Sequence, residues 1–227
     1  TQSRSSAASD VYKRQLLGCR LTVVAPDGAV TVRLTETEAY GNAGADPGAH
    51  SFRGRTERNA ALFGPPRRTY VYLNYGIHRC LNLVGHPEGE AGGVLLRAAE
   101  VLAGGDLAVA RRGRDTGPKL LSGPGNLGQG LGITLEMGHA PVEIVAAPPE
   151  VADDGGTSAR LAAPAAPARF LLAPPAPRDP AEPPIEVVTG PRVGVSGEGG
   201  SVRFPWRFSV AGHRSVSAFR RGRNVPD

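Results

Sequence analysis

Glu36, Glu38 and Tyr40 place two carboxylates and a phenol at every second position of one short segment. The residues before them, 30–34, also alternate between apolar and polar, and this period of two predicts a β-strand that runs into a loop. Residues two apart lie on one face of a strand, so the three side chains should project together. Buried carboxylates are costly, and Glu38, which leaves a strand end toward a loop carrying His50, is a candidate general base. The alternative is an edge strand whose glutamates face water.

Three of the five tyrosines in the chain lie in one segment, at Tyr70, Tyr72 and Tyr75. Tyr70 and Tyr72 share one face of a predicted strand, and Asn74-Tyr75-Gly76 has residues typical of a hairpin turn. An aromatic side chain at an exposed tip, with arginines nearby, is suited to wedging between stacked bases. The alternative is a core aromatic pair and one ordinary surface tyrosine.

Nine short motifs occur in order along the chain. They are Glu36-Thr-Glu-Ala-Tyr40, Ala49-His-Ser51, Arg58-Asn59, Tyr70-Val-Tyr72, Tyr75-Gly76, Cys80-Leu-Asn82, Val94-Leu-Leu-Arg97-Ala98, Ser122-Gly-Pro124 and Pro191-Arg-Val-Gly-Val195. Together they resemble the 3-methyladenine DNA glycosylase family of the alkyladenine type. The resemblance runs from about Leu16 to the C-terminus and weakens in a Pro/Ala-rich segment.

For the chemistry, the resemblance implies hydrolysis of an N-glycosidic bond after the damaged nucleotide has been flipped out of the duplex. Glu38 would deprotonate or orient the attacking water and stabilise the oxocarbenium-like sugar. Arg97 and the backbone carbonyl of Val193 would hold that water and Glu38 in place. These three residues are the expected catalytic set.

For recognition, the resemblance implies that Tyr40, His50 and Tyr72 sandwich the extruded base, because an electron-rich aromatic cage favours a cationic alkylated purine. Asn82 matches the position that crowds the exocyclic amine of normal guanine, and Tyr75 would fill the gap left in the stack. For His50, the alternative is a loop histidine with an ordinary structural hydrogen bond.

Arginines are bunched in two blocks of this chain, whose net charge is +5. Residues 51–79 contain six arginines against one acidic residue, Glu57, and residues 201–223 contain six more with no Asp or Glu. Such blocks are suited to phosphate contacts, although a generally basic surface is the alternative. The expected DNA-backbone contacts are Arg53, Arg55 and Arg58, together with Ser122, Gly123 and Gly125, which the resemblance places at a helix entry facing a phosphate.

Two other patterns in the sequence suggest ligands and are rejected. The segment 123–128 matches G-x-G-x-x-G, but it contains a proline and lacks a surrounding βαβ unit. None of the five histidines pairs with another at ligand spacing on one element, so no metal is expected. The chain is expected to need no cofactor.

Cys19 and Cys80 form neither a CxxC pair nor a disulfide framework, which favours an intracellular setting, cytoplasmic or in the nucleoid if the source is bacterial. The sequence contains no apolar run of membrane-spanning length and no signal-peptide pattern. Double-stranded DNA is the expected partner of a monomer that does not bind a membrane.

The predicted fold class is α+β, a single compact domain with a curved, mainly antiparallel sheet, peripheral helices and a protruding β-hairpin. Strands are predicted at 16–24, 31–38, 70–75, 77–84, 94–101, 185–195 and 202–210, with a turn at 26–28 between the first two. A short helix or turn is expected at 58–63, and helices are expected at 100–112 and 125–131. The domain spans 16–227, after a polar, non-native or disordered tail at 1–15. Residues 146–184, rich in Pro and Ala, are expected to form a surface insert except around 169–172.

The function expected from these observations is a monofunctional DNA glycosylase of base excision repair. It would remove 3-methyladenine, 7-methylguanine and, by extension, deaminated or etheno purines from duplex DNA. Strand-nicking glycosylases use an amine nucleophile, and Lys119 is the single lysine between residues 16 and 227. The alternatives are a non-catalytic module that binds damaged nucleic acid and an RNA-binding domain.

Overall fold

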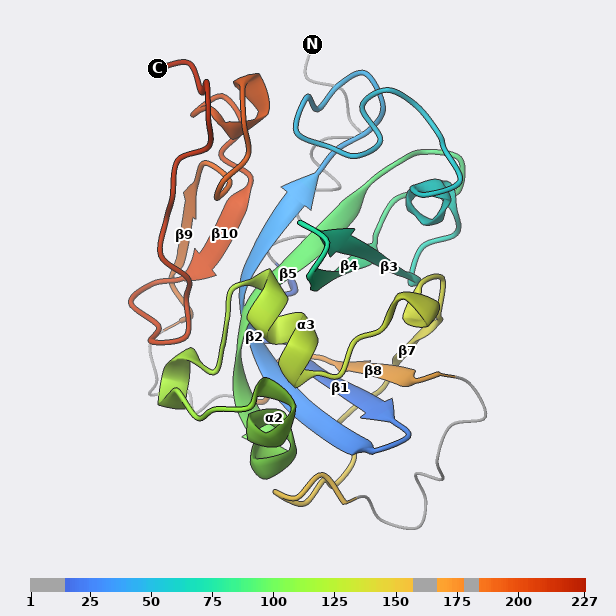
Figure 1. The fold of residues 1–227 in the computed structure, drawn as a ribbon, viewed down its shortest axis with the longest axis vertical. Helices are drawn as coiled ribbons and strands as arrows, with labels where there is room; N and C mark the ends of the chain where they lie inside the picture. The colour runs from blue at the N-terminus through green and yellow to red at the C-terminus, as the bar shows by residue number, and fades with distance from the viewer. Residues whose placement is uncertain (1–14, 157–166, 178–183) are drawn as a thin grey trace.

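The computed structural model describes residues 15–156, 167–177 and 184–227. In these residues one curved sheet follows the order β3-β4-β5-β2-β1-β8-β7, and β6, β9 and β10 branch from it (Figure 1). Its strands are β1 (Arg20–Ala25), β2 (Gly28–Tyr40), β3 (Thr69–Asn74), β4 (His78–Val84), β5 (Gly93–Ala103), β6 (Leu121–Ser122), β7 (Val142–Ile144), β8 (Arg169–Ala173), β9 (Val187–Gly190) and β10 (Arg207–Val210). The β7–β8 pair is parallel and the other pairs are antiparallel, so the predicted α+β fold with a mainly antiparallel, curved sheet is confirmed.

Strand β2 is the long central strand of the sheet. One of its edges pairs with β5, and the other pairs first with β1 and then, at Glu36–Glu38, with β10. The sharp β1–β2 connection closes at Ala25 and Gly28, as the Asp27-Gly28 pattern predicts. An edge strand with water-facing glutamates is therefore excluded, because both edges of β2 are paired around Glu38.

The β2–β5 ladder is irregular beside the two glutamates. The register passes from Leu34 to Glu36 without a partner for Thr35, and on β5 it skips Arg97. A bulge of this kind bends the strand and re-aims the side chains next to it. This irregularity aims Arg97 of β5 at the carboxylates of β2.

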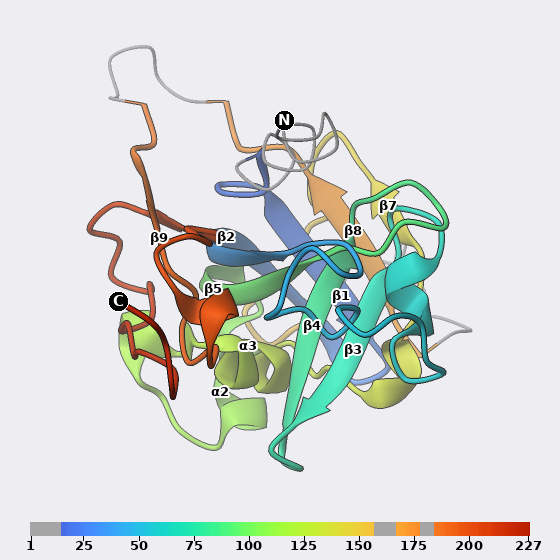
Figure 2. The same ribbon diagram turned by 90° about the horizontal axis from the view of Figure 1, so that it is seen from above.

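The hairpin β3–β4 projects from one side of the molecule (Figure 2). Tyr75, at its tip, has φ of 50°, in the left-handed region, and Gly76 beside it has φ of 72°. The Tyr75 side chain is 86% exposed. A bulky residue in this conformation costs free energy, so the tip holds an exposed aromatic ring where a glycine or asparagine would be more stable.

Helices α2 (Gly105–Arg112) and α3 (Pro124–Gly130) cover the same face of the sheet, in front of β2 and β5 in Figure 1. Leu127 and Leu131 at α3 are fully buried in the main core with Leu34 and Leu96 of the sheet. Short 3-10 turns lie at Ala60–Phe63 (η1), Gly117–Lys119 (η2), Leu135–Met137 (η3) and Glu198–Gly200 (η4). The helix predicted at 100–112 starts too early: β5 continues to Ala103, and Gly104, with φ of 75°, turns the chain into α2.

Within the Pro/Ala-rich segment, the residues around 169–172 that were expected as its exception form strand β8 and contribute to the core. Strand β8 lies between β1 and β7, and Phe170 and Leu171 are buried. The apolar residues 170–173 suffice for this, because one edge of β8 pairs with β1 and the other pairs with β7. Other parts of the expected insert, 157–166 and 178–183, lie outside the described residues, as does nearly all of the expected tail at 1–15.

Strands β1, β9 and β10 are shorter than predicted. Residues 16–18 form a turn before β1, with Gly18 at φ of 82°, and β9 and β10 each comprise four residues. The residues between β9 and β10 instead form a loop that returns to the C-terminal end of β2.

Candidate active site

A pocket of about 620 Å³ opens between the end of β2, the β3–β4 hairpin, β5, the start of α3 and the loop after β9. Its lining residues are Tyr40, Pro47, Gly48, His50, Leu62, Tyr70, Tyr72, Asn74, Tyr75, His78, Asn82, Gly93, Leu95, Arg97, Gly123, Pro124, Gly125, Asn126 and the loop residues Val193, Gly194, Val195 and Ser196. Residues from most of the sequence motifs thus meet around one cavity.

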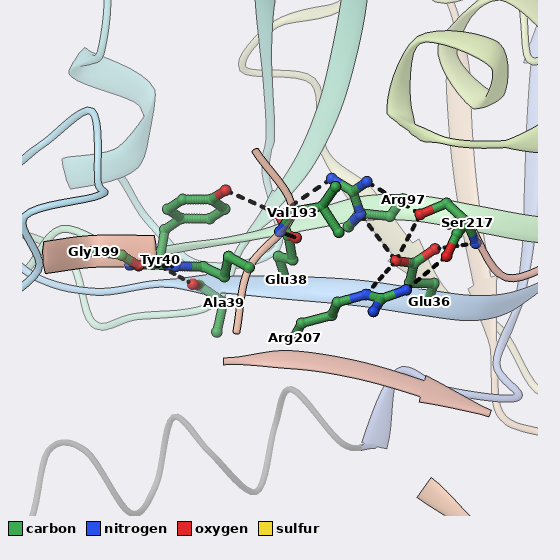
Figure 3. Close-up of polar contacts among 10 residues, drawn as sticks. Glu36, Glu38, Ala39, Tyr40, Arg97, Val193, Gly199, Arg207 and Ser217 are labelled. Atoms are coloured by element: carbon green, nitrogen blue, oxygen red, sulfur yellow. Dashed lines mark hydrogen bonds and ion pairs between the residues drawn. The ribbon is translucent and has the colours of Figure 1, made fainter. Parts of the chain in front are cut away.

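Glu38 lies beneath the inner wall of this pocket with its carboxylate fully buried (Figure 3). Its Oε1 accepts a hydrogen bond from the Val193 amide at 2.6 Å. Its Oε2 accepts from the Tyr40 hydroxyl at 3.0 Å and from Nη1 of Arg97 at 3.4 Å. Each donor belongs to a residue that lines the pocket, so the carboxylate is held directly behind the pocket surface.

Val193 makes a contact that the family resemblance of the sequence motifs did not imply. The resemblance implied a role for its backbone carbonyl, whereas the contact to Glu38 is made by its backbone amide. The carbonyl's role stays a prediction.

Glu36 forms the second layer of the site. Its carboxylate is fully buried and accepts from Nε of Arg97 at 3.0 Å, Nε of Arg207 at 2.7 Å, and the amide and hydroxyl of Ser217 at 2.8 and 2.9 Å. Burial alone would raise the pKa of Glu36, but Arg97, Arg207 and Ser217 hold that pKa below its usual value. Glu36 is therefore a fixed anion whose partners orient it.

Arg97 bridges the two carboxylates of β2. Burial opposes its charge, but Glu38 and Glu36 together raise the pKa of Arg97 above its usual value. Its third nitrogen, Nη2, donates to the Ser217 hydroxyl at 3.2 Å. The guanidinium is thus held by contacts on all three nitrogens, and it lines the pocket beside Glu38.

Aromatic rings form one wall of the pocket. The His50 and Tyr72 rings are 4.5 Å apart edge to face, and Tyr70 and Tyr72 stack at 5.7 Å. Nδ1 of His50 lies 3.0 Å from the Tyr70 hydroxyl. Burial and then the positive charge of Arg58 lower the pKa of His50, so this ring is neutral at pH 7.

The tyrosine hydroxyls around the pocket keep their protons. Burial raises the pKa of Tyr70 to about 12, and burial followed by Glu38 raises the pKa of Tyr40 well above its usual value. Burial also raises the pKa of Tyr72. Tyr40 consequently keeps its proton at pH 7 and donates it to Glu38 in a hydrogen bond.

The outer part of the pocket lies under the hairpin tip. Tyr75 and His78 both line this part, and Gly125 at the start of α3 lies so close that a Cβ there would come within 2.6 Å of Nδ1 of His78. Asn82, deeper in the pocket, donates from Nδ2 to the Tyr70 carbonyl at 3.1 Å.

The six expected DNA-backbone residues occupy three different settings. Gly123 and Gly125 line the pocket, whereas Ser122 pairs with Ala98 in the sheet. Arg53, Arg55 and Arg58 are exposed on the loop after His50 and lie outside the pocket lining. Arg58 donates from Nη2 to the Leu73 carbonyl at 3.4 Å.

The G-x-G-x-x-G segment has a structural explanation. Gly123 has φ of 93° at the entry to α3, and a Cβ at Gly128 would come within 1.9 Å of the Arg79 carbonyl oxygen. The glycines therefore permit a tight turn and close packing of α3 on β4. The two-residue strand β6 before the helix belongs to an antiparallel pair, which is not the geometry of a dinucleotide fold.

The sequence analysis did not predict Arg207 and Ser217, which bind Glu36, or one buried ion pair beside the pocket. Arg192, fully buried, forms an ion pair with buried Asp46 at 2.6 Å. Arg192 precedes Val193 in the motif Pro191-Arg-Val-Gly-Val195, so the sequence offered one indication that Arg192 lies near the site. The sequence offered no such indication for Asp46, because this residue lies in a loop rich in Gly and Ala and outside the motifs.

Within the described ranges, no three His, Cys, Asp or Glu side chains gather in a way that could hold a metal ion. Nor does any helix there have the length and apolar character needed to cross a membrane.

Comparison with known proteins matches residues 4–214 to the model of a family described as methylpurine-DNA glycosylase. A protein of Leifsonia xyli subsp. xyli with the provisional name 3-methyladenine DNA glycosylase is 43% identical over 208 residues, which are 91% of this chain and 86% of the relative. Proteins with the same provisional name occur in Nocardia farcinica, at 44% identity over 94% of this chain and 88% of the relative, and in Nitrosospira multiformis, at 40% identity over 93% and 90%.

Proposed function

This chain belongs to the methylpurine-DNA glycosylase family, and we propose that it hydrolyses the N-glycosidic bond of alkylated purines, 3-methyladenine and 7-methylguanine among them, in duplex DNA. Deaminated and etheno purines are the proposed wider substrate class. The observation that carries the proposal is the buried carboxylate of Glu38, held by three donors directly behind an aromatic pocket.

The pocket accounts for how a base would be bound. A base inside a duplex is inaccessible and has to be flipped out before the bond can be cut. Tyr75 is exposed at the hairpin tip that borders the pocket, so its ring can replace the extruded base in the stack. The flipped base then enters among Tyr40, His50 and Tyr72.

Charge favours damaged purines in this pocket. The phenols of Tyr40 and Tyr72 are protonated and His50 is neutral, so the rings present electron-rich faces without a net charge. A cationic alkylated base gains about 0.5–2 kcal/mol from such a contact when it is desolvated. Asn82 would add discrimination against the exocyclic amine of guanine.

Glu38 would act on the attacking water. A carboxylate offers about four acceptor sites, and the Val193 amide, the Tyr40 hydroxyl and Arg97 occupy three of them. The remaining site can accept a hydrogen bond from one water. As that water attacks the anomeric carbon, the bond to the base breaks, the base leaves with the bonding electrons, and Glu38 takes the proton from the water.

The charge of the base decides how easily it leaves. An alkylated purine that carries a positive charge departs as a neutral molecule. A neutral base such as hypoxanthine leaves as an anion unless a proton reaches it. Removal of a cationic purine therefore depends less on a group that donates a proton. The site described above supplies a proton acceptor in Glu38.

We assign the reaction to simple hydrolysis without strand cleavage. Lys119 donates from Nζ to the Val216 carbonyl at 2.7 Å and lines a different cavity, beside β10. Lys119 therefore lies outside the pocket beside Glu38, where an amine nucleophile would attack the sugar. The protein would act as an intracellular monomer on duplex DNA.

The experiment uses a duplex with a single 7-methylguanine and a second with a single hypoxanthine. We expect free base in solution and an abasic site in equal amount, with the strand intact until alkali is added. The surface variant Glu143→Gln serves as a control with wild-type activity, because Glu143 pairs with Arg169 on β8, away from the pocket lining. Tight binding without base release would overturn the proposal in favour of a damage-binding module, and a preference for RNA would point to RNA recognition.

A further inference from the structure

Arg192 and Asp46 form a fully satisfied buried ion pair. The five N–H donors of Arg192 match five hydrogen bonds: two to Asp46 at 2.6 and 2.7 Å, two to the Gly199 carbonyl at 2.6 and 3.1 Å, and one to the Ala39 carbonyl at 3.0 Å. Asp46 also accepts from the amides of Gly41 and Gly48, both at 2.9 Å. A buried ion pair often adds little net stability. The full set of hydrogen bonds around Arg192 and Asp46 therefore calls for an explanation other than stability.

The pair connects three parts of the active site that lie far apart in the sequence. Arg192 directly precedes Val193, whose amide donates to Glu38. Its bond to the Ala39 carbonyl fixes the backbone between Glu38 and Tyr40, and its guanidinium carbon lies 4.6 Å from the centre of the Tyr40 ring. Two of the three donors to Glu38 therefore depend on the position of Arg192.

Asp46 extends the connection to the loop that carries His50. The Asp46 carbonyl accepts from the Ala49 amide at 3.0 Å, one residue before His50. Gly48 packs so tightly that a Cβ there would come within 2.6 Å of Nη2 of Arg192. Movement of either ionic partner would shift this loop, whose Pro47, Gly48 and His50 line the pocket.

We propose that Arg192 and Asp46 are positioning residues that fix the donors of Glu38 and give the Tyr40 ring a charge-neutral backing for a cationic base. The inference rests on the proposed glycosylase function. Arg192 alone would place a positive charge against a ring that also lines the pocket, and so oppose a cationic base there. Asp46 cancels that charge through two short contacts.

Two variants separate the charge-neutral backing of Tyr40 from the positioning of the Glu38 donors. Asp46→Asn keeps the shape of the side chain but leaves the charge of Arg192 uncompensated behind Tyr40. We expect release of cationic 7-methylguanine to fall on the order of tenfold more than release of neutral hypoxanthine, in line with the strength of a cation–π contact.

The double variant Arg192→Met with Asp46→Leu removes both charges and leaves no unpaired ion in the core. We expect release of both bases to fall on the order of 100-fold, because loosened positioning of the reacting groups has an effect of this size. The ratio of the two release rates should stay near that of the wild type. Duplex affinity should change by less than roughly threefold, because phosphate contacts dominate it.

All rates are single-turnover rates per folded protein, with the folded fraction taken from thermal unfolding. Arg169→Met is the control, because Arg169 has a matching two-bond pair with Glu143 at the β7–β8 edge. If the wild type releases base and Asp46→Asn keeps the wild-type ratio, or the double variant keeps the wild-type rate, the inference is overturned while the proposed function stands. If the wild type releases no base from either duplex, the function fails and the inference falls with it.

Discussion

The amide nitrogen of Val193 lies 2.6 Å from Oε1 of Glu38, although the two residues are 155 positions apart in the chain. The contact joins the loop after β9 to the central strand β2 and closes the pocket from one side. In Figure 3, Tyr40 and Arg97 approach the same carboxylate from opposite sides. The proposed water therefore meets a carboxylate whose direction is set by three separate elements of the fold.

Replacing Glu36 by Gln should destabilise the protein at pH 7 on the order of 3 kcal/mol, because it leaves Arg97 and Arg207 without their shared anion. The folded-state pKa of Glu36 is lowered, so its stabilising contribution is present above the unfolded value of about 4.3 and is lost as the pH falls through the folded value. Urea unfolding of wild type and variant at pH 7 and below pH 4 checks this. A free-energy difference that stays constant over this range would contradict it.

Acidification should weaken the preference for cationic bases. The pKa of His50 lies below its usual value, so the ring is neutral at pH 7 and gains a proton only below about pH 6.5, the value for an unperturbed histidine. A protonated His50 would repel a cationic base. Lesion affinity measured with the Glu38→Gln variant between pH 7.5 and 5 should show the preference for 7-methylguanine over hypoxanthine decline. The same decline with His50→Asn added would show that another group is responsible.

Tyr75→Asn should separate folding from function. Asparagine tolerates the left-handed backbone at this position better than tyrosine, so thermal stability should be unchanged or higher. Base release should fall roughly tenfold to 100-fold, because unstacking a base step costs a few kcal/mol that the wedge no longer offsets. Single-turnover release and thermal unfolding are the measurements. Unchanged release would mean that the tip does not enter the stack.

Changing Arg53, Arg55 and Arg58 to Ala should reduce the salt dependence of duplex binding. Each lost phosphate contact lowers the slope of log affinity against log salt by ~0.9. Binding of undamaged duplex between 50 and 200 mM salt gives the slope, with Arg169→Ala as the control for loss of charge alone. Equal slopes for the triple variant and the wild type would remove these arginines from the interface.

The sequence predicted local features of the site well. Alternation along β2 predicted that Glu36, Glu38 and Tyr40 would share a face, and two of them bind Arg97 while Tyr40 donates to Glu38. The turn residues predicted the hairpin with Tyr75 at its tip. Both are short-range patterns, in which neighbouring residues alone determine which side chains point together.

Features that depend on distant partners could not be predicted in the same way. The bulge at Thr35 and Arg97 arises from the register of two strands, and neither strand shows it alone. Arg192 and Asp46 meet across 146 positions, and Asp46 lies in a loop of small residues without a motif. The sequence marked residues 169–172 as the exception within the Pro/Ala-rich segment, but it did not predict their place as strand β8 between β1 and β7.

Glu38 is the residue on which the proposed chemistry depends. The most direct test is single-turnover release of 7-methylguanine from duplex DNA by the wild type and by Glu38→Gln, with lesion affinity measured in parallel. We expect the variant to bind as tightly as the wild type and to release base at least on the order of 100-fold more slowly, as for loss of a general base. Release at the wild-type rate by a folded Glu38→Gln protein would contradict the account.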